Sequence, residues 1–254
     1  MFVDLNCDLG ESFGSYRRGN DEAVMRSISS ANIACGFHAG DPTVMRQTVR
    51  LALARGVAIG AHPGFLDLMG FGRREMRLKP QEVEDLVLYQ VSALAGIAAA
   101  EGGRLQHVKP HGALYNMAAM EIALAEAIAR PIAAIDRSLV LFGRSDSRLL
   151  DAGRAAGLRV ASEVFADRAY EPDGSLVSRS SPGAIVHDPS AVVTRAVQMV
   201  RDGRVMTAAG EPVALQADTI CVHGDTPGAA ELAAALRAGL ETAGVEIRPA
   251  GSAA

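Results

Sequence analysis

Four of the six histidines in this sequence follow a short apolar run and have a glycine within two residues. They are His38 in ACGFHAG, His62 in AIGAHPG, His111 in HVKPHG and His223 in ICVHG. In a protein built from parallel strands, the carboxyl ends of the strands open on one face, and the loops that follow them carry the binding groups. We therefore expect these four imidazoles to converge on the rim of an active site.

The first apolar run, Phe2 to Leu9, alternates polar and apolar residues. Its polar residues share one face because the side chains of a strand alternate between two faces. A surface strand of an antiparallel sheet shows the same alternation. In a parallel sheet the polar face points into the interior, where ionisable groups are costly unless they are paired or functional. Candidate site residues here are Asn6, Asp8 and, in the following loop, Glu11.

The fourth apolar run carries a lysine between two histidines, in the sequence QHVKPHG. A period of two places His107, Lys109 and His111 on one face. A lysine buried among other cations has reason to lose its proton and act as a base or nucleophile, or it stays charged and holds a carboxylate or phosphate. We interpret His107, near the start of the run, as a core histidine whose ring is bonded to backbone.

Two later segments add carboxylates and arginines. In SEVFADRAYEP, Glu163 and Asp167 are an even number of residues apart, so they would lie on one face of a strand, and such a pair of carboxylates suits general acid–base catalysis. Arg168 leads into a long polar loop that is a candidate lid. In GFGRR, Arg73 or Arg74 can lie over an anionic group, although paired arginines are more often a solvated surface.

Three of these side chains also form a possible metal site. Asp8, His38 and His62 make up the Asp-His-His set found at hydrolytic metal centres, which would hold a divalent ion. Asn32 is an even number of residues before His38, so the two side chains are expected on the same side of the chain. Asp225, two residues after His223, would either orient that imidazole or cap the next helix.

Eight strand-like runs alternate with segments of helical spacing, which predicts an α/β protein with a parallel sheet. We favour a closed, TIM-like β/α barrel of seven or eight strands, because polar residues follow most of the runs rather than one switch point. The predicted strands are Phe2 to Leu9, Ala31 to Gly36, Val57 to Ala61, Gln106 to Lys109, Leu139 to Gly143, Arg159 to Phe165, Thr219 to Val222 and Val245 to Arg248.

The helices between these runs have recognisable ends. Asp41 before Pro42 and Thr226 before Pro227 have the signature of a capped helix start, and Gly56 is a helix stop. Residues 1–250 are predicted to form a single domain, with a hairpin inserted at 205–217 and a frayed tail at 251–254.

The composition narrows the class of ligand. The net charge of -4 gives no electrostatic case for nucleic acid or an anionic membrane, which leaves small polar molecules. No apolar run approaches the roughly 20 residues of a membrane span, and MFVDLNCDLGE carries acids where a signal peptide carries bases. We expect a cytoplasmic protein.

Six motifs, in order, closely resemble those of the LamB/YcsF family: DLNCDLGESFG, SANIACGFHAGDP, GAHPGF with GFGRR, VKPHGALYN, EVFADRAY and ICVHGDTPGA. The resemblance runs from Asp4 to about Ala229. It implies a barrel related to those of glycoside hydrolases and deacetylases. It also implies the activity of the A subunit of ATP-hydrolysing 5-oxoprolinase, with ATP as co-substrate, 5-oxoproline as the lactam substrate, and partner subunits B and C. Leu66 and Leu68 stand where a more polar loop is expected.

The reaction implied by the resemblance gives the candidate residues their roles. Asp8 or Glu163 would act as base, His62 and His111 would stabilise developing charge, and Lys109 with Arg168 would hold carboxylate and phosphate. The remaining candidates for substrate binding are Asn6, Glu11, Asn32, Arg73, Asp167, His223 and Asp225. Two alternatives stay open, a metal-dependent deacetylase or carbohydrate hydrolase and a non-catalytic lactam-binding component.

Overall fold

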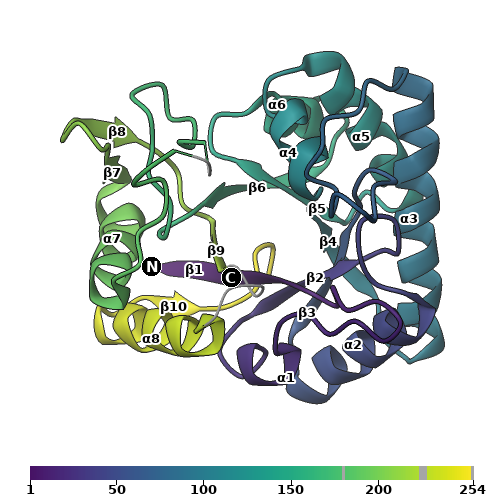
Figure 1. Cartoon of the computed structure of the whole chain (residues 1–254), viewed down its shortest axis with the longest axis horizontal. Helices are drawn as coiled ribbons and strands as arrows, with labels where there is room; N and C mark the ends of the chain where they lie inside the picture. The colour runs from purple at the N-terminus through teal and green to yellow at the C-terminus, as the bar shows by residue number, and fades with distance from the viewer. Residues whose placement is uncertain (179–180, 223–227, 253–254) are drawn as a thin grey trace.

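The computed structural model describes residues 1–178, 181–222 and 228–252. At its centre, parallel strands form a barrel with helices around it (Figure 1). Seven strands pair in the order β1-β2-β3-β4-β5-β6-β9, and β9 pairs with β1 to close the ring. They are β1 (Phe2–Leu9), β2 (Ser30–Ala34), β3 (Ala58–His62), β4 (Leu105–Val108), β5 (Val140–Arg144), β6 (Arg159–Val164) and β9 (Thr219–Val222). The predicted closed parallel barrel is confirmed.

The eighth predicted run is a strand that lies outside the ring. This strand, β10 (Glu246–Ile247), pairs with the amino-terminal end of β1, where Phe2 lies opposite Glu246 and Val3 opposite Ile247. With only two residues, it extends the sheet at one end of β1 and does not contribute to closure. Within the described ranges, the barrel is therefore seven-stranded.

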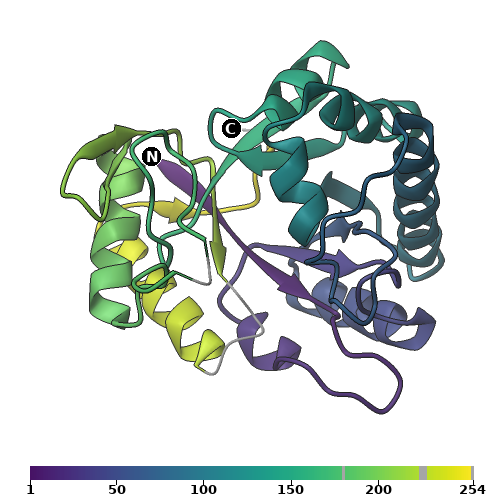
Figure 2. The ribbon, with the colours of Figure 1, turned by 45° about the horizontal axis from the view of Figure 1, so that its top comes forward.

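Helices connect the strands and cover the outside of the barrel (Figure 2). The first long helix shows how its sequence sets both ends. Asp41 Oδ1 accepts hydrogen bonds from the amides of Thr43 and Val44, and Gly56 ends the helix with a φ of 65°. Both predicted signals are confirmed, while Thr226 and Pro227 lie outside the described residues. The helices are α1 (Asp21–Val24), α2 (Pro42–Arg55), α3 (Pro80–Ala100), α4 (Gly112–Ala118), α5 (Ile122–Ile135), α6 (Arg148–Ala155), α7 (Pro189–Asp202) and α8 (Ala229–Thr242).

The expectation that no apolar segment approaches the length of a membrane span is wrong for helix α3. It has 21 residues and is long and apolar enough, by length and composition, to cross a bilayer. In the fold it is one of the helices around the barrel. Its buried residues Val83, Val87, Val91 and Leu94 recur every three or four positions and form one inward stripe.

A hairpin lies between α7 and β9, in the segment that breaks the strand–helix alternation. Its strands, β7 (Arg204–Met206) and β8 (Pro212–Ala214), pair antiparallel in a separate two-stranded sheet. In Figure 1 the hairpin stands beside α7, away from the helices that follow β2, β3 and β4.

Candidate active site in the upper barrel

Strand β1 places its three inward polar residues at three levels of the barrel, because alternate side chains face inward. The lowest, Asp4, is fully buried. Its Oδ1 accepts hydrogen bonds from Ser29 at 2.6 Å and Ser30 at 2.7 Å, and its Oδ2 accepts one from Thr219 at 2.5 Å. Burial raises the pKa of Asp4 to about 6, although the three hydroxyl groups oppose the rise.

The middle level is a network of buried amides. The amide nitrogen of Asn6 donates to Glu163 Oε1 at 2.9 Å, and Asn6 Oδ1 accepts from Asn32 at 2.7 Å. His107 Nε2 lies 2.8 Å from Asn32 Oδ1. His107 is a core histidine as predicted, but its partner is a side chain and not the backbone. This level supports the site from below.

Lys109 joins the middle level to the upper one. Its Nζ lies 2.9 Å from Asp8 Oδ1, 2.8 Å from Glu163 Oε1 and 3.0 Å from Cys221 Sγ. Burial alone would lower the pKa of Lys109, but Asp8, Cys221 and Glu163 together raise it well above its ordinary value. Of the two states left open by the sequence, the structure favours the charged one.

Asp8 is the carboxylate that reaches the upper end of the barrel. Its side chain is 16% exposed, whereas that of Glu163 is completely buried. Burial alone would raise the pKa of Asp8, but nearby His62 and Lys109 hold it well below its usual range. An ionised carboxylate therefore stands at the rim, with Oδ2 3.3 Å from His62 Nε2.

Three of the predicted imidazoles converge beside Asp8. His62 Nε2 and His111 Nδ1 are 2.9 Å apart, and the rings of His38 and His111 stack with centroids 3.8 Å apart. Burial and the neighbouring imidazoles lower the pKa of His38 well below its ordinary value and that of His111 to about 3. Both rings are therefore neutral near pH 7.

This cluster includes a carboxylate, though not the one predicted as a metal ligand. Glu11, His38, His62 and His111 are all buried, and they place one ligand atom each within 4.8 Å of one another, an arrangement that a metal ion could use. The predicted metal set was Asp8, His38 and His62. Asp8 is not in this grouping: Lys109 and Asn32 contact its Oδ1, and its Oδ2 lies 3.3 Å from His62 Nε2. The grouping contains Glu11, which was predicted to bind substrate, and His111.

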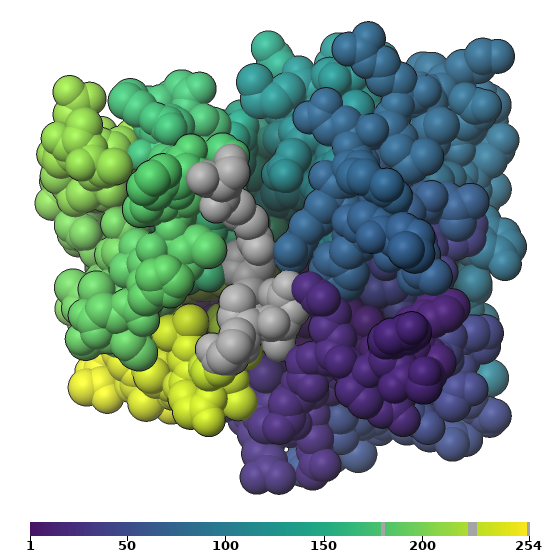
Figure 3. Space-filling model, in the orientation of Figure 1, coloured from purple at the N-terminus to yellow at the C-terminus, as the bar shows by residue number. Residues whose placement is uncertain are grey.

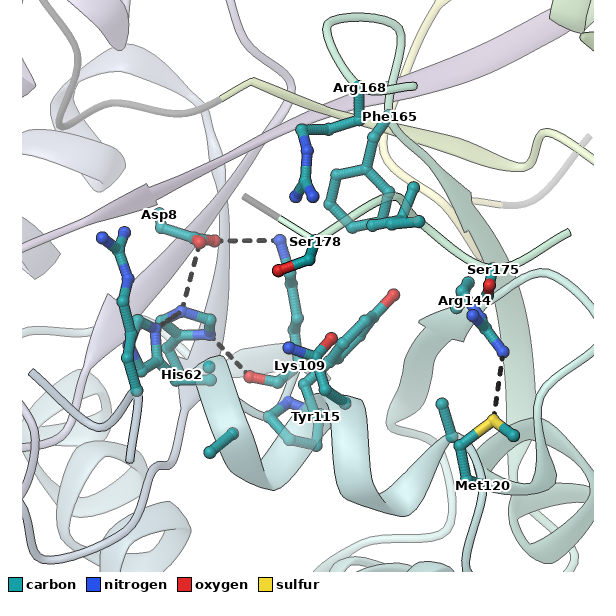
Figure 4. A pocket seen from close by; sticks show the side chains of 18 of the residues that line it. Asp8, His62, Lys109, Tyr115, Met120, Arg144, Phe165, Arg168, Ser175 and Ser178 are labelled. Carbon is teal, nitrogen blue, oxygen red and sulfur yellow. Dashed lines mark hydrogen bonds and ion pairs between the residues drawn. The ribbon is translucent and has the colours of Figure 1, made fainter. Parts of the chain in front are cut away.

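A cavity of about 490 Å³ opens at this end of the barrel. Figure 4 shows Asp8 and His62 at one side of it and Arg144 with Met120 at the other, with Lys109 and Tyr115 between them. In Figure 3 the amino-terminal part of the chain (purple to blue) and the green segment that follows β6 lie on opposite sides of the visible surface. The predicted residues that line the cavity are Asp8, Glu11, His62, Arg73, Lys109, His111 and Arg168.

The two loop arginines differ in their surroundings. Arg74 forms an ion pair with Asp67, whereas Arg73 lines the cavity and its guanidinium carbon is 5.0 Å from the centre of the Phe71 ring. Arg168 lines the cavity too, and it donates to the backbone oxygens of Val177 and Ala184. Arg168 therefore ties the loop after β6 into place.

The other predicted site residues lie elsewhere. Asn6, Asn32 and Glu163 are buried at the level below the cavity. Asp167 is not among the lining residues in the described part of the chain. His223 and Asp225 lie outside the described residues.

Arg144 and Tyr115 also line the cavity, and of these two Arg144 was not predicted from the sequence. Arg144 ends β5, and the Nε atom of this side chain is buried without a hydrogen-bond partner among the described residues. Tyr115 on α4 is buried, and Glu163 contributes with burial to raising the pKa of its hydroxyl. Arg144 could have been found, because it directly follows the fifth apolar run, LVLFG, as the predicted residues follow the other runs.

The sequence is similar to those of several bacterial proteins. A protein from Bordetella pertussis described as the A subunit of 5-oxoprolinase is 58% identical over 98% of both chains. Its counterparts from Tolumonas auensis and Bacillus subtilis are 60% and 54% identical, over 97% and 96% of this chain and 98% and 95% of theirs.

Two solved structures are similar to this chain in fold. The lactam utilization protein from Thermus thermophilus superposes with a TM-score of 0.93 at 50% identity, covering 98% of this chain and 99% of that one. A putative cellobiose-phosphate cleavage protein from Enterococcus faecalis shares the fold, with a TM-score of 0.54 at 12% identity, covering 96% of this chain and 95% of that one. Residues 3–254 match the LamB/YcsF family, and the chain belongs to that family.

Proposed function

We propose that this chain is the A subunit of an ATP-dependent 5-oxoprolinase, which opens the lactam of 5-oxo-L-proline to give L-glutamate. The observation that carries the proposal is the identity of 54–60% with relatives of that description over nearly their whole length. The cavity supports it, because it combines an ionised carboxylate, the neutral imidazole of His111 and arginines in a volume suited to a small polar molecule.

The chemistry explains why the enzyme spends ATP. Amide resonance makes the lactam carbonyl a poor electrophile. Transfer of the γ-phosphoryl group of ATP to the lactam oxygen releases ADP and activates the ring carbon. Water then adds to that carbon, the C–N bond breaks as the nitrogen takes up a proton, and a second water releases phosphate from the resulting acyl phosphate.

We assign Asp8 as the group that orients the attacking water and takes its proton. Of the two carboxylates proposed for this role, only Asp8 lines the cavity, since Glu163 is buried beneath Lys109. Lys109 acts through Asp8, because its ammonium group is surrounded by protein acceptors and holds the carboxylate ionised and in position. Removal of a base of this kind typically lowers a rate by 10²- to 10⁴-fold, roughly.

Arg144 is assigned to the anionic end of the substrate. It lies across the cavity from Asp8, and its Nη2 contacts Met120 Sδ at 3.6 Å, a weak acceptor. A guanidinium group in this setting suits a carboxylate, which it can bind through two parallel hydrogen bonds. The carboxylate of 5-oxoproline would lie at Arg144 and the ring would extend toward Asp8.

The assembled enzyme would include the B and C subunits, with ATP as co-substrate. The relatives' description as one lettered subunit of an enzyme supports the presence of partner subunits. The chain has no GxxxxGK[ST] sequence, so an ATP site in this protein would need another phosphate cradle. Cytoplasmic location remains a prediction.

The test is reconstitution with three arms: this chain alone, the B and C subunits alone, and all three together. Each arm receives 5-oxoproline and ATP, and glutamate and ADP are measured separately. Glutamate from the full set only is the expected result. Full activity without this chain, or no glutamate with it, would reject the proposal. Lactam binding without turnover would favour the non-catalytic alternative, and ATP-independent hydrolysis by this chain alone would favour the metal hydrolase.

A further inference from the structure

Two backbone carbonyl groups fix the protonation of the histidines in the upper cluster. His62 Nδ1 lies 2.7 Å from the carbonyl oxygen of Lys109, and His111 Nε2 lies 2.8 Å from that of Phe71. A carbonyl oxygen only accepts hydrogen bonds, so each of these nitrogens carries a proton. A ring that carries only this one proton has its lone pair on the other nitrogen, which is Nε2 in His62 and Nδ1 in His111.

Those two lone pairs face each other. His62 Nε2 and His111 Nδ1 are 2.9 Å apart, and both side chains are buried. Two acceptors at this distance repel unless a positive species satisfies both. A shared proton or a metal ion are the two ways to supply one.

His38 distinguishes between them. Its ring is fully buried, and neither ring nitrogen has a hydrogen-bond partner within the described ranges. Buried polar atoms in native proteins are almost always paired, so an orphaned imidazole next to two facing lone pairs indicates a missing ligand. A proton between His62 and His111 would leave His38 unsatisfied, whereas a metal ion can bind all three rings.

The surrounding loop is built to hold the rings in place. Phe71 has a φ of 55°, a conformation that is rare for a bulky side chain, and its carbonyl oxygen is the one that His111 contacts. A Cβ atom on Gly72 would lie 2.7 Å from His38 Cβ and 2.8 Å from His111 Cδ2, so the stacked rings need glycine at this position. Metal-binding histidines commonly have their second nitrogen held in this way by a carbonyl group.

We propose that Glu11, His38, His62 and His111 bind one divalent transition-metal ion. Three imidazole nitrogens and one carboxylate oxygen suit zinc or a neighbouring first-row ion and do not suit calcium or magnesium. With bonds of about 2.1 Å, such an ion spans ligand pairs up to about 4.2 Å apart. The widest spacing in the cluster, up to 4.8 Å, would close by a fraction of an ångström on binding.

This site goes beyond the proposed function, because it adds a bound ion next to Asp8 that lactam opening does not by itself require. When bound, the ion would act as a Lewis acid at that end of the cavity. Binding is measured without turnover, so its failure and the failure of the proposed activity are separate results.

The experiment uses the full-length chain, purified with a tag that contains no histidine and stripped with a chelator. Zn²⁺ and Co²⁺ are titrated by calorimetry, and bound metal is counted by mass spectrometry after desalting. We expect one ion per chain, a rise in unfolding temperature, and a Co²⁺ absorption spectrum with nitrogen coordination. No ion retained by the folded wild-type chain would overturn the proposal.

Variants identify the ligands. We expect His38→Gln and His111→Gln each to weaken Zn²⁺ binding at least about a hundredfold, and Glu11→Gln to weaken it measurably. The matched control His187→Gln, outside the cluster, should bind as the wild type does. Circular dichroism checks that each variant folds. An Asp8→Asn chain that loses the ion while Glu11→Gln retains it would overturn the ligand set in favour of the one expected from sequence.

Discussion

The two ends of the barrel interior contain buried polar clusters of opposite character. At the lower end, the Asp4 carboxylate accepts hydrogen bonds from three hydroxyl groups. At the upper end, His62 Nε2 and His111 Nδ1 lie 2.9 Å apart, and the nitrogens of His38 have no partner among the described residues. Both clusters are buried, and they differ in whether the protein satisfies its own polar groups. The saturated cluster needs no further partner, and the unsaturated one is where a ligand is expected.

Substitution of Lys109 is expected to have the largest effect on the buried polar clusters. Lys109→Met would leave Asp8 and Glu163 without their shared cation, and removing one partner of a buried ion pair costs about 3–5 kcal/mol. We expect a loss of that order in the free energy of unfolding, measured by urea denaturation, together with loss of glutamate release in the assembled enzyme. The sequence offers one matched control, Lys79→Met, which changes the only other lysine at an exposed position. Unchanged stability and glutamate release in the Lys109 variant would remove it from the account.

Asp4 tests the saturated end. Because the pKa of Asp4 is raised from 3.8 to about 6 in the folded chain, folding favours its protonated form. The free energy of unfolding should therefore fall as the pH rises from about 4 to 6, by about 3 kcal/mol for this group. In Asp4→Asn that contribution is absent, so the variant should gain stability relative to the wild type between pH 4 and pH 7.

The measurement is urea unfolding of the wild type, Asp4→Asn and a control at both pH values. Asp85→Asn on the exposed side of α3 serves as the control, and it should keep the pH dependence of the wild type. Parallel pH profiles for all three chains would show that Asp4 is ionised at little cost, and would contradict the raised pKa of Asp4.

Substitution of Arg144 is expected to have the smallest effect, and it separates substrate binding at one side of the cavity from the chemistry at Asp8 on the other. Arg144→Met removes one charge-assisted contact to the substrate carboxylate and leaves Asp8 in place. We expect KM for 5-oxoproline to rise about tenfold, which corresponds to about 1.4 kcal/mol, with little change in kcat. Steady-state kinetics of the assembled enzyme checks this, with the exposed Arg148→Met as control. A fall in kcat at unchanged KM would place Arg144 in the chemistry instead.

Much of the barrel could be predicted because its signals are local. Alternation in β1 and the Asp41–Pro42 and Gly56 ends of α2 each depend on a few consecutive residues. The short helices α1 and α4 could not be predicted, since four and seven residues give too little periodicity to stand out. The outer position of β10 was missed as well, because ring closure depends on the pairing of β1 with β9, far apart in sequence.

Several members of the candidate site were predictable from the sequence, whereas their pairings were not. Alternation along the strands and position at the strand ends predicted Asp8, His62, Lys109 and His111 as site residues. Which carboxylate joins the histidines depends on three-dimensional contacts, since Asp8 is held by Lys109 and the loop after β1 brings in Glu11. Sequence spacing cannot distinguish these two carboxylates.

The most direct test of the account compares Asp8→Asn with Asp4→Asn in the enzyme assembled with the B and C subunits. The two substitutions make the same change on the same strand, one at the unsaturated end and one at the saturated end. Glutamate release per folded chain should fall at least about a hundredfold for Asp8→Asn and stay within about threefold of wild type for Asp4→Asn. Equal activities of the two variants, or an active Asp8→Asn enzyme, would contradict the assignment of lactam opening to the upper barrel.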